Sequence, residues 1–334
     1  MNENSNSVQH CEDEINLKEL ILALWKRKIM IVCFTLIGAI LAGMYSMFVL
    51  SPVYNTKLNI VISMPEKYNS KYGDYTLPIS SNEQYINLIL SNDVLVKTIE
   101  KMGYDKEIVT IEKLKKRISI GKNVAQSGTV QNSFEVTVSA DNPEESLKLT
   151  QILYNSYLDL MDFMIKERAV NYYYNHFSVE LKVLNNFLET EKENLKYNEE
   201  LFSQTPKIIA TDTAAVETVN PNYIKLENDI VANRQSIITT ENSIREINQY
   251  LEELNRERQA IKNYITGKTD KFESGIVEVV ETNIYLPSPP VAPTQKTSPS
   301  NALNTAIGTV IGGMLGVMIA LFQEYWVKET IVSK

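Results

Sequence analysis

The tetrapeptide Thr266-Gly267-Lys268-Thr269 has the Gly-Lys-Thr ending of a phosphate-binding loop. A complete P-loop also has a glycine five positions before the glycine of this tetrapeptide, and Lys262 occupies that position. The tetrapeptide also ends an expected helix, whereas the motif must follow a strand and open a helix. The sequence therefore argues against a nucleotide site here.

Histidine and cysteine are too few to build common catalytic or metal sites. The chain has two histidines, His10 and His176, and two cysteines, Cys11 and Cys33. Two cysteines predict neither a disulfide framework nor a zinc cluster. A Ser-His-Asp triad would have to use His176, whose expected helical, aromatic setting favours a packing or surface role. The carboxylates form no conspicuous pair, so we expect no catalytic residue, cofactor or metal, and no enzyme.

The length and charge of the chain limit the number of domains and the kinds of partner. The 334 residues are enough for two domains. The formal net charge of -8 and the pI near 5.1 argue against nucleic acid as a partner, because phosphate recognition needs a basic face.

Two uncharged runs, residues 29–50 and 302–322, are each long enough to cross a bilayer core of about 30 Å. A buried helix of a soluble protein rarely lacks a polar face over such a length. The first run suits a retained anchor better than a cleaved signal peptide. Lys26, Arg27 and Lys28 precede it, so the positive-inside rule places both termini in the cytoplasm and residues 51–301 outside.

Small residues at intervals of four predict a helix-packing face in these spans. Its partner is left open, because the other span and neighbouring copies satisfy the pattern equally well, and simple tolerance of glycine is the plain alternative. The residues are Gly308, Gly312, Gly313 and Gly316 in the second span and, more weakly, Ala39 and Gly43 in the first.

The exported part begins and ends with strand-like segments. Residues 53–64 and 133–143 read as strands, and residues 82–102 and 111–118 as helices, the first stopped by Gly103. Residues 275–287 read as a closing strand. We therefore expect an α/β base next to the membrane, formed by residues 51–142 and 267–286.

Heptad repeats dominate residues 143–266 and predict a long coiled-coil hairpin. Each arm opens with an asparagine cap and a proline, and a short polar stretch joins the arms, so they are expected to fold back on each other. A kink or a change of partner is expected near Glu167 and residues 171–177. The seam residues are Leu153, Leu160, Leu181 and Leu188 in the first arm and Ile230, Ile237, Ile244 and Leu251 in the second.

The order of these elements resembles the Wzz-type chain-length determinants, also called polysaccharide co-polymerases. The resemblance rests on "DEINLKELILALWKRK" (residues 13–28), on "PVYNTKLNI" after the first span, and on "SPSNALNTAIGTVIGGMLGVMIALFQEY" (residues 298–325). The exported middle matches only in pattern. Asn16 departs from the family, which more often has an acidic residue there.

The resemblance implies an α+β membrane protein with two transmembrane helices, a membrane-proximal α/β base and a long exported antiparallel coiled-coil hairpin. It implies a homo-oligomeric ring in the cytoplasmic membrane, with its central domain periplasmic or extracellular. Such a ring works with a separate polymerase, and with the growing glycan, to set the length of an O-antigen, capsule or exopolysaccharide.

A proline-rich strap, residues 287–301, would run extended from the base to the second span. The alternative is a flexible linker, but the prolines restrict the backbone and make that alternative less attractive. The strap prolines are Pro287, Pro289, Pro290, Pro293 and Pro299, and residues 323–334 form a short cytoplasmic tail.

Other functions remain open. The nearest is the kinase-coupled adaptor branch of the same family, which activates a separate cytoplasmic tyrosine kinase. A sensory receptor would need a signalling module that a twelve-residue tail does not provide. An efflux-pump adaptor normally has one membrane anchor and glycine-rich lipoyl halves, whereas this chain has two spans.

Overall fold

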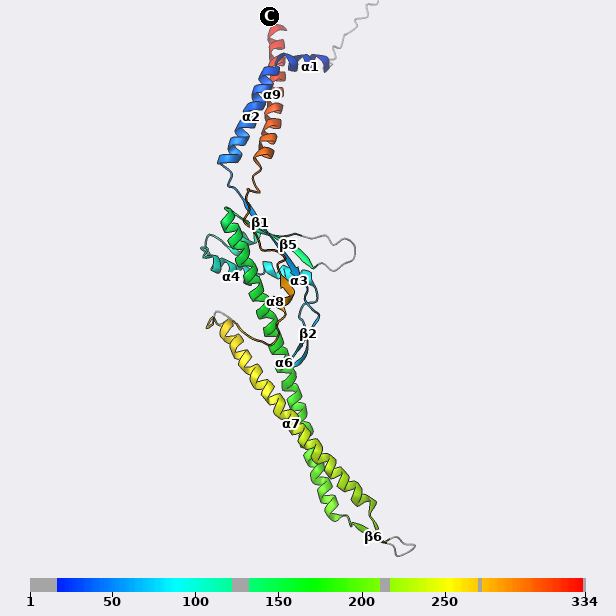
Figure 1. The fold of residues 1–334 in the computed structure, drawn as a ribbon. Coiled ribbons are helices and arrows are strands. Elements are labelled where there is room, and N and C mark those ends of the chain that lie inside the picture. The colour runs from blue at the N-terminus through cyan, green and yellow to red at the C-terminus, as the bar shows by residue number, and fades with distance from the viewer. Residues whose placement is uncertain (1–16, 122–131, 211–216, 270–271, 333–334) are drawn as a thin grey trace, which may run out of the picture.

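The computed structural model describes residues 17–121, 132–210, 217–269 and 272–332 of an elongated molecule. Two apolar helices, α2 (Lys28–Phe48) and α9 (Asn301–Val332), run side by side at one end, a sheet with short helices lies in the middle, and a long helical hairpin forms the other end (Figure 1). Both helices contain a segment long and apolar enough to cross a membrane. The expected architecture of two apolar helices, a base and a long helical hairpin is confirmed. His10 and Cys11 lie outside the described ranges.

The base is built on a four-stranded antiparallel sheet in the order β4-β5-β1-β8. Its strands are β1 (Tyr54–Ile62), β4 (Ile118–Gly121), β5 (Ser133–Ala140) and β8 (Ile284–Tyr285). In the central pair, Leu58 lies opposite Val136 and Ile60 opposite Phe134. Because apolar residues alternate along both strands, one face of the sheet is buried in the core and the other carries polar side chains.

Short capped helices complete the base. These are α3 (Asn82–Asn87), α4 (Asn92–Met102) and α5 (Ile111–Lys116). The single helix expected over residues 82–102 is interrupted by the 3-10 turn Leu88–Leu90, because the Ser91 side chain caps a new helix by accepting from the Val94 N–H. Gly103 ends α4 in the left-handed conformation, as expected.

The closing strand expected over residues 275–287 is mostly wrong. Only Ile284 and Tyr285 form a strand, which pairs with β1, and α8 (Val280–Asn283) precedes it. The β-branched residues suggested a strand, but Ile276, Val277 and Val280 are all buried from loop and helix positions. Their burial therefore does not follow the alternation of a half-buried strand.

Helices α6 (Pro143–Gln204) and α7 (Pro221–Ile265) form the hairpin. Their ring contacts run in opposite directions along the two helices, from Phe163 with Tyr264 through Phe177 with Tyr250 to the Phe202–Tyr223 pair at the far end. Helix α6 is continuous past Glu167. A change of partner does occur near residues 171–177, where Tyr173 still contacts the base and Phe177 already contacts Tyr250 of α7. The joining stretch, expected to be a polar loop, contains the short paired strands β6 (Ile208–Ala210) and β7 (Glu217–Val219).

Candidate functional site

The predicted glycine face of α9 lies against α2 of the same chain, at very close range. A methyl group added at Gly312 would come within 2.5 Å of the Phe34 carbonyl oxygen, and one at Gly316 within 3.0 Å of the Ile31 Cα. A methyl group at Gly308 would overlap the Ala42 side chain. These glycines therefore let the two backbones approach.

The contact face of α2 is partly different from the expected one. Gly38 contacts both Gly308 and Gly312, and Ala42 contacts Gly308. No atom of Ala39 is among the nearest neighbours of the α9 glycines. Gly43 does face α9, with Thr305 Oγ1 within 3.1 Å of a methyl group placed there. Gly38 and Ala42 form the same four-residue spacing as Ala39 and Gly43, so the pattern could have revealed them.

Polar clusters close both ends of the α2–α9 pair. At one end Asn304 donates to the buried Ser46 hydroxyl at 2.9 Å, and Ser46 donates to Asn301 at 3.0 Å. At the other end the Arg27 guanidinium bonds Glu324 at 3.4 Å. These hydrogen bonds between the helices add to the packing of the glycines.

The proline strap returns the chain to the start of β1. Residues 286–297 form neither helix nor strand, and the Val53 N–H donates to the Ser298 carbonyl at 2.8 Å. Pro287 and Pro289 are exposed and the other strap prolines are half-buried. Whether the strap has polyproline geometry stays a prediction.

The seam of the hairpin begins later on α6 than expected. Leu153 is buried in the core of the base, because α6 crosses the sheet before α7 joins it. Leu160, Leu181 and Leu251 are half-buried and pack against the core cluster. The remaining predicted seam residues, Leu188, Ile230, Ile237 and Ile244, are half-buried or buried on α6 and α7.

A cluster of three polar side chains interrupts the apolar seam near the end of the hairpin that is farther from the base. Asn198 of α6 donates to the Asn233 side chain of α7 at 2.9 Å, and Asn233 donates to Glu191 at 3.2 Å. All three fall in the heptad frame of the apolar seam, which was the signal that the sequence offered. A polar residue at such a position commonly fixes the register of two helices at some cost in stability.

A second hairpin, formed by β2 (Lys67–Ser70) and β3 (Gly73–Thr76), ties the base to α6 and α7; we call residues 67–76 the clasp. The Glu253 carboxylate of α7 accepts from Lys71 Nζ at 2.7 Å and from the Tyr72 hydroxyl at 2.9 Å. The Tyr173 hydroxyl of α6 donates to the Gly73 carbonyl at 2.8 Å.

Aromatic packing and charge reinforce the clasp. The Tyr72 ring lies 5.3 Å from both Tyr173 and Tyr250 and meets Tyr250 edge-on. The hydrogen bond from Lys71 lowers the pKa of Glu253, and the same hydrogen bond raises the pKa of Lys71. Burial, together with the bond to Glu253, raises the pKa of Tyr72. The clasp, α6 and α7 are thus joined by a cluster of aromatic rings and by the Lys71–Glu253 ion pair.

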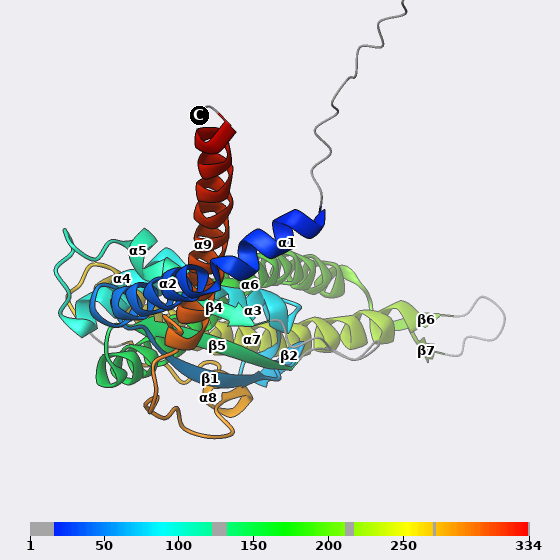
Figure 2. The ribbon, with the colours of Figure 1, turned by 90° about the horizontal axis from the view of Figure 1, so that it is seen from above.

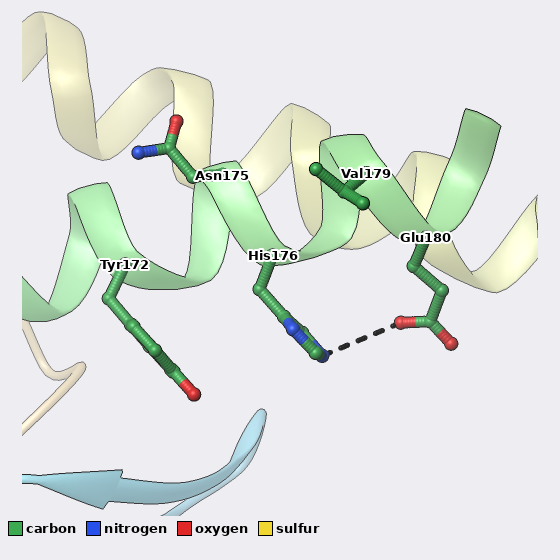
Figure 3. A pocket seen from close by; sticks show the side chains of 5 residues that line it. All are labelled: Tyr172, Asn175, His176, Val179 and Glu180. Carbon is green, nitrogen blue, oxygen red and sulfur yellow. Dashed lines mark ion pairs between the residues drawn. The ribbon is translucent and has the colours of Figure 1, made fainter. Parts of the chain in front are cut away.

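His176 lies on the outer side of α6, where its Nε2 is 3.7 Å from the Glu180 carboxylate (Figure 3). Its ring is stacked on Tyr172 at 6.1 Å, and the shallow hollow beside it is also lined by Asn175 and Val179. This lining contains no serine, cysteine or threonine that His176 could activate as a nucleophile. Within the described part of the chain, no three His, Cys, Asp or Glu side chains are grouped to hold a metal ion.

The tetrapeptide at residues 266–269 ends α7, as expected. Thr266 is the cap residue, and Gly267 has a φ of 69°, the left-handed conformation common after a helix. A phosphate cradle at the start of a helix is therefore not formed there.

In comparisons with known proteins, the first part of the chain matches a protein family. Residues 13–102 match the model of the family described as Wzz, chain length determinant protein. The chain is 31% identical over 149 residues to the capsular polysaccharide biosynthesis protein CpsC of Streptococcus agalactiae, covering 43% of this chain and 60% of that protein. For CpsC of Streptococcus pneumoniae the identity is 29% over 143 residues, with 42% and 59% covered.

The chain thus spans about 60% of the length of these relatives. A solved structure, a full-length bacterial polysaccharide co-polymerase, is 14% identical and covers 94% of this chain and 99% of its own, with a TM-score of 0.48. The matched residues 13–102 include α2, β1, α3 and α4, and over this part the chain is similar to the Wzz chain length determinant family.

Proposed function

We propose that this protein is a membrane-anchored, oligomeric regulator of polysaccharide chain length that acts with a separate polymerase. The family match over residues 13–102 supports the regulatory role, and the CpsC relatives favour a capsular polysaccharide among the candidates. In this proposal both termini are cytoplasmic, and the base and hairpin lie outside the membrane, because Lys26, Arg27 and Lys28 precede the first span.

Two apolar stripes on the outer surface of the hairpin carry the oligomeric part of the proposal. Helix α6 exposes Val179, Val183, Phe187, Tyr197 and Leu201, and helix α7 exposes Ile224, Val231 and Ile238 at intervals of seven. None of these residues falls in the heptad frame of the seam. Apolar side chains that recur along an exposed helix face are typical of helix-to-helix association.

The stripes match in level and face opposite sides. Contacts between α6 and α7 at Asn198–Asn233 and at Phe202–Tyr223 bring Tyr197 level with Val231 and Leu201 level with Ile224. If the seam residues are assigned to the a and d positions of a heptad, the α6 stripe lies on the g side of the seam and the α7 stripe lies on the e side. In an antiparallel pair of helices, these two sides are on opposite faces of the hairpin. The α7 stripe of one copy can therefore pack on the α6 stripe of the next, and repetition of such a head-to-tail contact closes a ring.

The experiment compares two variants in cells that lack the chromosomal gene, with surface polysaccharide lengths read on a gel. Aspartate at both Ile237 and Ile244 puts two charges into the half-buried apolar seam, which weakens the packing of α6 on α7. We expect this protein to insert, since neither span changes, and to yield polysaccharide of unregulated length.

Alanine at His176 is the matched control, because it alters the most enzyme-like side chain and leaves the seam intact. We expect it to preserve length control at normal abundance. If His176→Ala abolished length control while the double aspartate variant behaved like the parent, the scaffold proposal would be wrong and the protein would act through a catalytic site.

A further inference from the structure

Helix α1 (Leu17–Lys26) leaves the α2–α9 pair sideways, directly at the end of the apolar part of α2 (Figure 1). The view along the molecule shows the same divergence, with α1 projecting away from α9 (Figure 2). Only Arg27 separates α1 from α2, and its guanidinium is bound to Glu324 of α9. The C-terminal end of α1 is thus held next to both spans.

Much of the apolar surface of α1 is uncovered. Among the side chains described, those of residues 20–26, only Ala23 is buried, with 9% of its surface exposed, and Leu20 and Leu24 are half-buried. Ile21, Leu22 and Trp25 are 56%, 59% and 69% exposed. The first residue of the apolar run in α2, Ile29, is exposed too, so the uncovered apolar surface continues from the span onto α1. A helix of this kind, with a large apolar face beside basic residues, suits a membrane interface.

Tryptophan and lysine mark the level at which α1 lies. The chain has two tryptophans, and both lie at this end of the spans: Trp25 on α1, and Trp326 on α9 two residues beyond Glu324. The Lys28 ammonium is 5.2 Å from the centre of the Trp25 ring, and the neighbouring Lys26 is exposed. Tryptophan is enriched at the headgroup level of membranes, and juxtamembrane lysines are attracted to anionic lipids.

We propose that α1 lies in the headgroup layer of the leaflet at this end of the spans and binds anionic lipid there. Ile21, Leu22 and Trp25 insert toward the acyl chains, and Lys26 and Lys28 contact the headgroup phosphates. This inference rests on the proposed insertion of α2 and α9. It adds that the chain has a third membrane contact, parallel to the surface, whose Arg27–Glu324 link restricts rotation of the two spans.

Tryptophan fluorescence tests this on the full chain in nanodiscs of phosphatidylcholine, with or without phosphatidylglycerol. Trp326→Phe leaves Trp25 as the only tryptophan. Two controls carry Trp25→Phe and Trp326→Phe with one new tryptophan, either Phe322→Trp in the span or Tyr285→Trp at an exposed position of the base. We expect iodide to quench Trp25 several-fold less than the tryptophan at position 285, and lipids brominated near the headgroup to quench it strongly.

The outcomes separate this inference from the proposed anchoring. If iodide reaches Trp25 as freely as position 285 while position 322 stays shielded, α1 is outside the bilayer and the inference is wrong. If position 322 is also quenched, the anchoring itself fails. We further expect phosphatidylglycerol to increase the shielding of Trp25, and Lys26→Gln with Lys28→Gln to remove that increase. Equal shielding in both lipids would overturn the anionic-lipid contact.

Discussion

Adding one methyl group at Gly312 should separate the two spans, whereas the same change at Gly313 should not. The methyl at Gly312 would lie 2.5 Å from the Phe34 carbonyl oxygen and 3.2 Å from the Gly38 Cα, which are backbone atoms that no side-chain rotation can move. At Gly313 the nearest atom is Thr35 Oγ1, at an ordinary contact distance of 3.4 Å. The two glycines are adjacent on one helix, so the comparison isolates the contact.

The size of the effect follows from the required displacement. Relief of the contact at Gly312 moves the helices apart by about 1 Å, a gap that forfeits roughly a quarter to a half of the attraction between the facing atoms. Overpacking of this kind costs about 1–3 kcal/mol. Alanine gains up to about 1 kcal/mol over glycine in a helix interior at either position. We therefore expect Gly312→Ala to destabilise the helix pair by about 1 kcal/mol and Gly313→Ala to be neutral or stabilising.

The assay is unfolding of the purified full chain in mild detergent by increasing fractions of SDS, followed by circular dichroism. We expect a lower midpoint for Gly312→Ala than for the parent, and an equal or higher one for Gly313→Ala. Polysaccharide length in cells provides the second reading. Equal midpoints for the two variants would show that the close approach of α2 and α9 does not contribute to stability.

Three further predictions concern topology, the clasp and assembly. On intact cells, a membrane-impermeant thiol reagent should label Ser203→Cys and miss Ser333→Cys; labelling at both positions would contradict the topology. Because hydrogen bonding lowers the pKa of Glu253, the clasp should stabilise the fold at neutral pH and lose that contribution as the pH falls through the folded pKa. Glu253→Gln should flatten this acid dependence of the thermal midpoint, and an unchanged pH profile would refute it. Cysteines at Tyr197 and Val231 should form disulfides between copies, and purely monomeric protein after oxidation would exclude the stripe contact.

The features that sequence alone predicted are those encoded by a long repeat or a long run. Apolar length identified α2 and α9, and sevenfold spacing identified the hairpin, because many residues contribute to each pattern. The strand around Leu58 and Ile60 was similarly plain, since its apolar residues alternate over the whole of β1.

The clasp escaped prediction because its residues carry no such pattern. Residues 67–76 are polar and aromatic without alternation, and their structure depends on distant partners, above all Glu253 and Tyr173. The α2 contact face was predicted only in part, for a related reason. Gly43 does face α9, but the sequence did not show that Gly38 and Ala42, rather than Ala39, meet the α9 glycines, because both pairs have the same spacing.

The continuity of α6 has a mechanical consequence. One helix of 62 residues is both the main support of the base sheet and one arm of the hairpin, so the two parts cannot turn independently. Beyond Phe177, its last deeply buried residue, the helix extends for about 40 Å as a lever arm. A tilt of about 10° at the base would move the tip by about 7 Å over that length. Small differences in how the base is seated are therefore enlarged at the far end of the molecule.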